Sequence, residues 1–381
     1  MRYYVIAGEA SGDLHGANLL RGIKDNDPQA VFRFWGGDRM AAVAGKENMV
    51  KHYKESSIMG FWEVVANLRK ILDLMSLCRR DIEAFAPDLL ILIDYAGFNL
   101  RMARFAKSRG IRTYYYIAPK VWAWKESRVK KIERYVDKLF VIFPFEVDYF
   151  TRRGIETYYF GNPIMDAIEE RSRVLSTPER FRRENGLDDR PIVALLAGSR
   201  RNEILYNLPF MVEVAAHFPE YQFLLAGVPW LKKELYESCM KKSAGNVFYL
   251  CDKTYEILSH ASAAIVTSGT ATLETALLGT PELVCYWCNH ISAAIAKIFL
   301  KLRWVSLVNI IMGREVVREL LYKDMVVSEA VAELRAIMPG GDKHESMMED
   351  FRQLAEAMGE KGASERVAAK MVELLRNDSR Q

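Results

Sequence analysis

The stretch that decides the fold is LLILIDYAGFNLRMARFAKSRGIRTYYYIA, residues 89–118. It reads as a buried strand over 89–94, a helix through NLRMARFAKS, and a second strand over 113–118. Both strand segments are apolar without clean alternation, which is typical of parallel strands covered on both faces. The stretch therefore predicts a strand–helix–strand unit within a parallel sheet.

The same pattern continues on both sides of this unit. Further strands are expected at 3–7, 31–36, 138–143 and 157–161, and, after a polar helical stretch over 161–191, at 192–198, 221–227, 246–250, 263–269 and 282–286. After Val316 only helical patterns are expected. We predict an α/β fold of two Rossmann-like, doubly wound domains, 1–165 and 166–345, followed by C-terminal helices over 346–381 that pack back on the first domain or on a partner subunit.

The composition limits the class of protein. The chain has 381 residues, half of them hydrophobic, and a net charge of +4 from 53 Lys and Arg against 49 Asp and Glu. No signal peptide and no apolar run of about 20 residues is recognised, so a cytoplasmic protein is expected. The five cysteines are scattered, and the C-x-x-C string of Cys285 and Cys288 reads as the end of a buried strand. The six histidines show no metal-ligand spacing.

One segment concentrates positive charge. Lys120–Tyr135 carries six Lys and Arg against two Glu, and Val129, Ile132 and the adjoining Val136 keep a helical apolar spacing. A basic helix face fits phosphate groups, anionic lipid or nucleic acid, or is simply a solvated surface.

Two loops of the second domain fit a nucleotide. In open parallel sheets, ligands lie beyond the carboxyl ends of the strands. Gly198, Ser199 and Arg200 follow one such strand, and an arginine binds phosphate bidentately. Ser268-Gly269-Thr270 ends another strand and begins a helix, whose N-terminus suits a diphosphate, with Glu274 placed to accept ribose hydroxyls. Ordinary helix caps remain the alternative for both loops.

The common nucleotide and metal motifs are missing. Neither G-x-x-x-x-G-K-[ST] nor G-x-G-x-x-G occurs, which weakens an NAD or ATP-hydrolysis function. The D-x-D string Asp25-Asn26-Asp27 precedes Pro28 at a helix end and reads as a turn. A metal-free reaction would need cationic groups and helix dipoles to stabilise a leaving diphosphate.

The first domain offers a general base. Asp94 ends a buried strand and is expected to face an inter-domain cleft, where it serves as the base or merely caps the next helix. Trp122 and Trp124 lie in the loop after the next strand, and either pack in the core or stack on sugar or lipid.

The ordered motifs resemble one enzyme family. AGEASGDLHGA, GGDRM, SIMGFWEV, IDYAGFN, YYIAPKVWAWKESRVKKI, PFE, GNPIMD, LLAGSR and SGTATLE follow one another in a match running from residue 7 to about 321. Together they resemble the lipid-A-disaccharide synthases, which are inverting, metal-independent glycosyltransferases of the two-Rossmann GT-B type. The resemblance implies transfer of 2,3-diacylglucosamine from UDP-2,3-diacylglucosamine to 2,3-diacylglucosamine 1-phosphate (lipid X). The products are UDP and a β-1,6-linked disaccharide 1-phosphate, in the lipid A and lipopolysaccharide synthesis of Gram-negative bacteria.

The resemblance also implies partners and a location. No cofactor, metal or nucleic acid is expected, and the enzyme is expected to lie peripherally on the inner face of the cytoplasmic membrane. A homodimer formed by exchange of C-terminal parts is a further implication.

Site residues carry over by motif. Asp94 becomes the base for the acceptor 6-hydroxyl. The UDP-sugar set comprises Gly198, Ser199, Arg200, Ser268, Gly269, Thr270, Glu274 and Asn309, and the acceptor set comprises Glu9, Ser11, Asp13, His15 and Trp122. Of these, Glu9, Asp13 and His15 are expected either to hold acceptor hydroxyls or to tune Asp94. Ala96 and Gly97 replace a proline and an aspartate of the family, which leaves Asp94 as the only carboxylate of its loop. Asn162 replaces a histidine, and the LAGSR and LVN segments each lack a family proline.

Two stretches are candidates for the membrane interface. Residues 58–75 place Phe61, Trp62, Val65, Leu68, Ile71, Leu72 and Met75 at helical spacing, and residues 291–307 mix apolar residues with Lys297, Lys301 and Arg303. Core helices are the alternative. For the whole protein, the alternatives are another GT-B enzyme using UDP-N-acetylglucosamine, a UDP-sugar epimerase, or a non-catalytic UDP-sugar or lipid-binding protein.

Overall fold

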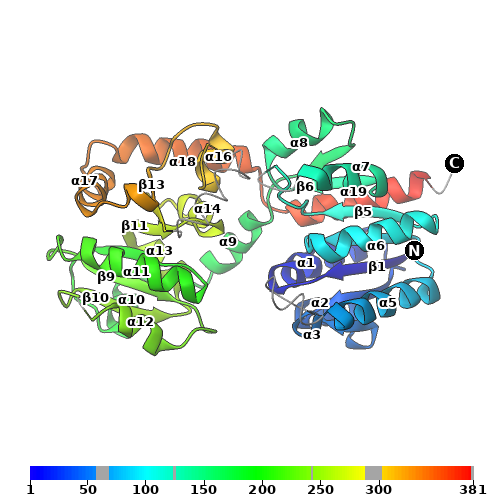
Figure 1. The fold of residues 1–381 in the computed structure, drawn as a ribbon, viewed down its shortest axis with the longest axis horizontal. Helices are drawn as coiled ribbons and strands as arrows, with labels where there is room; N and C mark the ends of the chain where they lie inside the picture. Colours follow the sequence, from blue (N-terminus) through cyan, green and yellow to red (C-terminus); the bar gives the residue numbers. More distant parts are fainter. Residues whose placement is uncertain (57–67, 123–125, 242, 288–302, 379–381) are drawn as a thin grey trace. The chain divides into compact units, whose positions relative to one another are not determined.

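The computed structural model describes residues 1–56, 68–122, 126–241, 243–287 and 303–378 (Figure 1). Backbone contacts divide the chain into two compact units, Met1–Pro163 with Gly359–Gln381 and Ile164–Met358. Each unit is built around one parallel sheet with helices on both faces, so the predicted pair of Rossmann-like domains is confirmed.

The first unit contains a seven-stranded parallel sheet in the order β3-β2-β1-β4-β5-β6-β7. Its strands are β1 (Arg2–Ala7), β2 (Val31–Gly36), β3 (Met49–His52), β4 (Leu89–Ile93), β5 (Arg112–Tyr116), β6 (Lys138–Val141) and β7 (Thr157–Tyr159). The central strands β1 and β4 are almost entirely buried, which explains why they read as unbroken apolar runs.

Helices cover both faces of this sheet. The helices are α1 (Ala10–Asn26), α2 (Asp38–Ala44), α3 (Tyr53–Ser56), α5 (Leu68–Phe85), α6 (Ala96–Ser108), α7 (Val129–Tyr135), α8 (Pro144–Thr151) and α19 (Ala363–Asp378). On one face Ile82, Ala103 and Ile132 of α5, α6 and α7 share a core with Tyr4 and Ile6 of β1. On the other face, α1 and α19 (blue and red in Figure 1) pack together against β1 residues that alternate with these, Tyr3 and Val5.

The second unit contains a six-stranded parallel sheet in the order β10-β9-β8-β11-β12-β13. The strands are β8 (Ile192–Leu196), β9 (Gln222–Gly227), β10 (Val247–Cys251), β11 (Ala261–Thr267), β12 (Glu282–Tyr286) and β13 (Glu319–Leu321). The helices are α9 (Ile164–Ser172), α10 (Pro178–Asn185), α11 (Arg201–Ala215), α12 (Lys233–Cys239), α13 (Thr254–His260), α14 (Thr270–Leu277), α16 (Leu307–Met312), α17 (Val327–Ile337) and α18 (His344–Met358). Within the described residues, short 3₁₀ helices lie at Lys46–Asn48 and Glu126–Arg128 in the first unit and at Tyr322–Asp324 in the second.

Several predicted boundaries differ from the structure. The expectation of helices alone after Val316 is wrong, because β13 pairs with β12. A three-residue strand is too short to show a periodicity, and the same holds for the four-residue β3. The predicted C-terminal segment 346–381 is divided between the units, since α18 contacts α14, α16 and α17 whereas α19 packs on α1.

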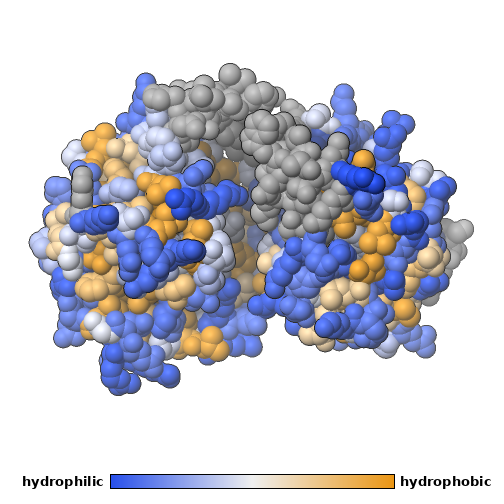
Figure 2. Space-filling view, turned by 60° about the horizontal axis from the view of Figure 1, so that its bottom comes forward, coloured by the Kyte–Doolittle hydropathy of each residue, from blue (hydrophilic) through white to orange (hydrophobic). Residues whose placement is uncertain are grey.

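The surface mixes side-chain types on both units. On the face drawn in Figure 2, hydrophilic side chains (blue) surround smaller patches of hydrophobic ones (orange). Such a mixture is expected where most apolar residues are already in a core. Among the described residues, no helix combines the length and the apolar composition needed to cross a membrane.

Candidate active site

The candidate residues gather where each sheet reverses its strand order. In the first sheet, β2 lies on one side of β1 and β4 lies on the other; in the second, β9 and β11 flank β8 in the same way. Ligands of open parallel sheets bind at the carboxyl ends of strands at such a reversal. The loops there are those after β1 and β4, and those after β8 and β11. These loops and the first turns of the helices that follow them contain most of the sequence-predicted site residues.

Asp94 follows β4 in a strained backbone conformation. Both Asp94 (φ 44°) and Tyr95 (φ 46°) are left-handed, which costs about 1–3 kcal/mol for each non-glycine residue. The Asp94 carbonyl accepts hydrogen bonds from the Asn99 side-chain amide (2.8 Å) and the Tyr115 hydroxyl. The Asn99 amide also donates to the Ile93 carbonyl (3.1 Å). Asn99, which the sequence had not singled out, therefore fixes the position of Asp94.

The Asp94 carboxyl has the properties of a base near neutral pH. Its pKa is raised to about 7, with burial the largest cause and the charge and hydrogen bond of Glu9 the next. The Lys120 ammonium acts in the opposite direction. A nearby carboxylate disfavours ionisation of Asp94, and a pKa near the working pH suits a group that must first lose and then accept a proton. Glu9, predicted for the acceptor side, is thus the neighbour that tunes Asp94.

Gly8 is required by the ring of Tyr95. A Cβ atom at Gly8 would lie 2.2 Å from Cγ of Tyr95, far inside van der Waals contact. The ring in turn stacks on Phe98, with centroids 5.4 Å apart. The first glycine of the opening loop therefore allows the β1 and β4 loops to approach each other.

The other predicted acceptor residues of this loop differ in role. Ser11 is exposed. Asp13 is buried, and its carboxylate accepts from the backbone amides of Gly37 (2.7 Å), Arg39 (3.1 Å) and Met40 (3.1 Å). It therefore anchors the start of α2, and we assign it a structural role in place of the acceptor contact. Burial lowers the pKa of His15 to about 4, and its buried Nδ1 has no hydrogen-bond partner among the described residues.

Trp122 is held by a carboxyl that sequence reasoning missed. Its indole Nε1 donates to Glu146 (2.9 Å), and its ring meets the Phe145 ring edge-on at 5.0 Å. Glu146 is 1% exposed, and burial raises its pKa to about 7. It also accepts from the Phe143 backbone amide (3.1 Å). Proline at the first position of α8 with glutamate at the third is a helix-start signal that could have identified Glu146.

The loop after β8 is closed by Glu203. Gly198 is left-handed (φ 110°), and a Cβ there would lie 2.6 Å from the Glu203 side chain. The Glu203 carboxylate accepts from the backbone amides of Ser199 (2.9 Å) and Arg200 (3.2 Å). Both amides therefore face a carboxylate of the same chain, a contact that the sequence did not indicate for a loop predicted to bind phosphate. The Arg200 guanidinium pairs with Glu203 at 3.0 Å and is 81% exposed, so it can reach a ligand.

The loop after β11 leaves a helix start uncapped. Gly269 (φ 150°, ψ −158°) has a conformation accessible almost only to glycine, and no side chain caps α14, which begins at Thr270. The Ser268 hydroxyl donates to the Val305 carbonyl (3.0 Å). One turn into α14, Glu274 accepts from the Tyr255 hydroxyl (2.7 Å), and burial raises its pKa.

Asn309 has a structural role. Its amide nitrogen donates to the Val317 carbonyl (2.8 Å) and to Glu319 (2.9 Å), while its oxygen accepts from the amides of Val316 (2.7 Å) and Val317 (3.0 Å). An asparagine amide has two donor and two acceptor positions, and all four are used. In the structure Asn309 therefore fixes the segment from α16 to β13, and its place near the nucleotide stays a prediction.

Three minor expectations concern metals and cysteines. Among the residues that the structure describes, no group of three or more His, Cys, Asp or Glu is arranged to hold a metal ion. Asp27 of the D-x-D string lies at the end of α1 and accepts from the Tyr3 hydroxyl (3.0 Å). Cys285 is buried in β12, as expected, whereas Cys288 and Trp124 lie outside the described residues.

Comparisons with known proteins agree on one family and one fold. The family model described as lipid-A-disaccharide synthetase matches residues 3–372. Proteins named lipid-A-disaccharide synthase from Syntrophus aciditrophicus and Myxococcus xanthus are each 35% identical, over 98% of this chain and 97% of theirs. One from Geobacter sulfurreducens is 36% identical with the same coverage.

Solved structures show the same fold at low identity. A UDP-GlcNAc 2-epimerase from Neisseria meningitidis bound to UDP-GlcNAc has a TM-score of 0.65 at 12% identity, covering 98% of this chain and 100% of its own. The glycotransferase of kitacinnamycin has a TM-score of 0.60 at 13% identity, covering 98% of each chain. At such identities the likeness concerns the fold alone.

Proposed function

This chain belongs to the lipid-A-disaccharide synthetase family, and from that premise we propose how its residues divide the reaction. It is a glycosyltransferase that makes the lipid A disaccharide. The donor is UDP-2,3-diacylglucosamine, bound through the loops of the second unit. The acceptor is 2,3-diacylglucosamine 1-phosphate, bound at the loops of the first unit.

The observation that carries the mechanism is the Asp94–Glu9 pair. Asp94 removes the proton from the acceptor 6-hydroxyl while that oxygen forms a bond to the anomeric carbon of the donor. The bond from that carbon to the UDP oxygen breaks, and the configuration inverts. A pKa of about 7 makes Asp94 a strong enough base to accept the proton and leaves a large fraction ionised at neutral pH. Lys120 favours the ionised form.

Three features of the second unit support donor binding. The uncapped start of α14 offers free amides and the positive end of a helix dipole for the diphosphate. The exposed Arg200 guanidinium adds a positive charge as the diphosphate leaves. Glu274, oriented by Tyr255, accepts the ribose hydroxyls.

The decisive experiment is turnover with defined substrates. The protein is incubated with UDP-2,3-diacylglucosamine and lipid X, and the disaccharide 1-phosphate is sought by mass spectrometry. Asp94→Asn should abolish product formation while retaining UDP binding, whereas Arg200→Ala should weaken UDP binding. Full activity of Asp94→Asn would place the base elsewhere, with Glu9 the next candidate.

The epimerase alternative has a separate test. The solved epimerases share the fold only, and the family match favours the synthase. An epimerase would convert UDP-N-acetylglucosamine in water without an acceptor. Incubation with that sugar alone should therefore give no new UDP-sugar. Adding lipid X to the same mixture tests the other alternative, a glycosyltransferase that uses UDP-N-acetylglucosamine as its donor.

Metal independence is part of the proposal. Arg200 and the α14 helix start would supply the positive charge that a metal ion supplies elsewhere. Turnover should then be unchanged in excess EDTA, and restoration of an EDTA-inhibited rate by Mg²⁺ would contradict this part.

We also propose a peripheral position on the inner face of the cytoplasmic membrane, because both substrates carry acyl chains. The predicted interfacial stretches fall largely outside the described residues. Of the first, Ile71 packs against the core, Met75 is buried, and Leu72 is 56% exposed. Binding of the native protein to anionic vesicles at low salt tests this position. A homodimer with exchanged C-terminal parts remains a proposal, which light scattering on the purified protein tests.

A further inference from the structure

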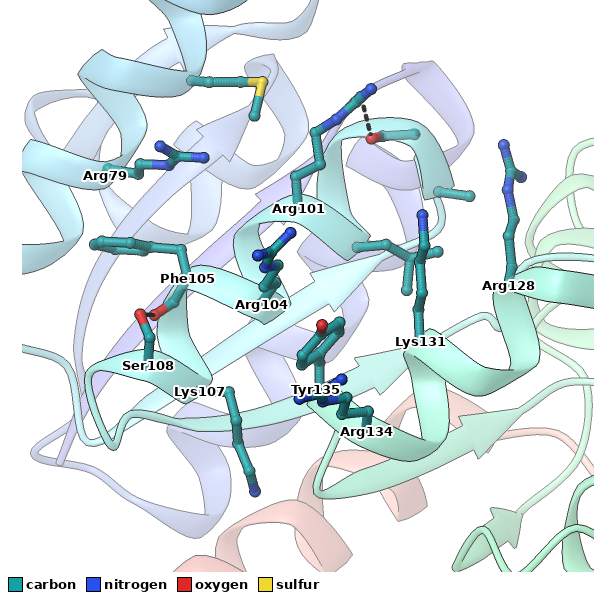
Figure 3. Close-up of a pocket in the computed structure, with 14 residues that line it drawn as sticks. Arg79, Arg101, Arg104, Phe105, Lys107, Ser108, Arg128, Lys131, Arg134 and Tyr135 are labelled. Atoms are coloured by element: carbon teal, nitrogen blue, oxygen red, sulfur yellow. Dashed lines mark hydrogen bonds between the residues drawn. The ribbon is translucent and has the colours of Figure 1, made fainter.

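The first unit contains a groove lined by cations that the proposed mechanism does not use. It lies between α5, α6 and α7 and encloses about 1050 Å³ (Figure 3). Lys and Arg supply half of its lining residues, and no Asp or Glu lines it among the described residues. The cations that matter below are Arg79 of α5, Arg104 and Lys107 of α6, and Lys131 and Arg134 of α7. Figure 3 shows that they come from all three helices around the groove.

Most of these cations are not neutralised within the described part of the chain. Lys107 pairs with Asp137 at 2.7 Å. No described carboxylate lies within ion-pair distance of Arg79, Arg104, Lys131 or Arg134; their side chains are exposed, and Arg79 lies over the Phe105 ring at 5.6 Å. Positive charges gathered in one concave surface repel one another and create a field that attracts anions. The groove is therefore suited to a negatively charged ligand.

The dimensions indicate more than one anionic group. The lining follows α6 from Gly97 to Ser108, a length of about 16 Å at 1.5 Å per residue. A single phosphate occupies only a small part of such a groove. Guanidinium groups bind phosphate oxygens bidentately, so an array of phosphates matches an array of arginines.

Apolar residues accompany the cations. Met75, Leu100 and Phe105 belong to the lining. Leu72 is 56% exposed and lies about one turn before Met75, on the side of α5 that carries Arg79. Of these apolar residues only Leu72 is exposed, and an exposed leucine beside a basic surface fits the boundary of a lipid bilayer. A nucleic acid would not need the exposed leucine.

We propose that this basic groove is the docking surface for the phosphate head groups of an anionic lipid bilayer. The proposal rests on the membrane position proposed above and identifies the residues responsible for it. One end of the groove is formed by Ala96 and Gly97, which directly follow the Asp94 loop. Docking there brings the base close to the surface from which an acylated acceptor must be taken.

The test compares two triple variants of equal charge change. Arg79→Gln/Arg104→Gln/Lys131→Gln removes three groove cations. Arg80→Gln/Arg21→Gln/Lys130→Gln removes three exposed cations that do not line the groove. Thermal melting followed by circular dichroism establishes that both are folded. Binding is measured by co-sedimentation with vesicles of equal parts phosphatidylcholine and phosphatidylglycerol, and with phosphatidylcholine alone.

The groove variant should bind the anionic vesicles about a hundredfold more weakly, since each cation near an anionic surface contributes about a factor of five. The control variant should keep at least a tenth of the native affinity. Salt should weaken binding of the native protein. Equal losses in both variants, or no loss in the groove variant, would overturn the proposal.

Two further measurements separate the possible ligands. With substrates dispersed in detergent, the groove variant should turn over at the native rate, because no bilayer is present. A raised KM for lipid X in detergent would instead identify the groove as the acceptor phosphate site and overturn bilayer docking. Tighter binding of a single-stranded oligonucleotide than of vesicles, lost in the same variant, would also overturn it. Absence of turnover in the native protein would refute the proposed function and leave the vesicle result intact.

Discussion

Replacing Glu9 with glutamine tests whether the two carboxyls of the first unit act together. In the native protein the pKa of Asp94 is about 7, compared with 3.8 for an ordinary aspartate, with burial the largest cause and Glu9 the next. Glu9→Gln removes the neighbouring charge but leaves the burial. The pKa of Asp94 should therefore fall by roughly one to two units without reaching its ordinary value.

The magnitude follows from the fraction of ionised base. At pH 6 about a tenth of native Asp94 is ionised, and in the variant about half or more. A carboxylate acts as a base only when ionised, so kcat/KM falls as the pH falls through its pKa. At pH 6 the kcat/KM of the variant, expressed as a fraction of its own maximum, should therefore be roughly five times the corresponding fraction for the native enzyme.

The assay is the pH dependence of kcat/KM with detergent-dispersed substrates. Glu133→Gln, an exposed position on α7, serves as the matched control and should leave the acidic limb unchanged. An acidic limb that stays in place or moves to higher pH in Glu9→Gln would refute the coupling. An acidic limb near pH 4 in the native enzyme would refute the assignment of Asp94 as the base.

Three other outcomes follow from the same geometry. Because folding raises the pKa of Asp94, ionisation of this group lowers the stability of the protein increasingly as the pH rises from about 4 to about 7. Asp94→Asn should therefore raise the free energy of unfolding, measured by urea denaturation, by up to about 4 kcal/mol at pH 8 and by less at pH 5. Gly8→Ala forces a Cβ into the Tyr95 ring and should cost about 1–3 kcal/mol and most of the activity, and a native melting temperature with full turnover would contradict the close approach. Asn309→Ala leaves the backbone amides of Val316 and Val317 and the Val317 carbonyl without this partner, whereas Glu319 keeps its bonds from Val305 and Ser306, and it should destabilise the protein by about 2–4 kcal/mol. The folded fraction should keep its affinity for UDP in calorimetry, and selective loss of that affinity in an otherwise stable variant would place Asn309 at the nucleotide site.

The sequence predicted the sheets well because their central strands are buried on both faces. The segments 31–36 and 282–286 match β2 and β12 residue for residue. The end of β4 was placed one residue late, because Asp94 adopts a left-handed conformation that apolar runs do not reveal. β13 was missed because its pairing with β12, not its own three residues, makes it a strand.

The site was predicted in part for a related reason. The carboxyl ends of parallel strands meet at one edge, so Asp94 and the opening loop could be brought together from the sequence. The pKa of Asp94 depends on Glu9, which is distant in the chain, and no spacing rule connects them. Asp13 and Asn309 resemble ligand-binding residues because buried backbone groups need the same polar partners that ligands need.

The last helix has a consequence for how this protein is made. α19 contributes Val367, Met371 and Leu375 to the core around β1, the first strand of the chain. A nascent chain that has emerged only as far as Met358 contains every element of the second unit, but its first unit still lacks one wall of its core. The part synthesised first is therefore the part completed last, and a ribosome that stops after Met358 leaves the earlier unit, not the later one, open to chaperones and proteases.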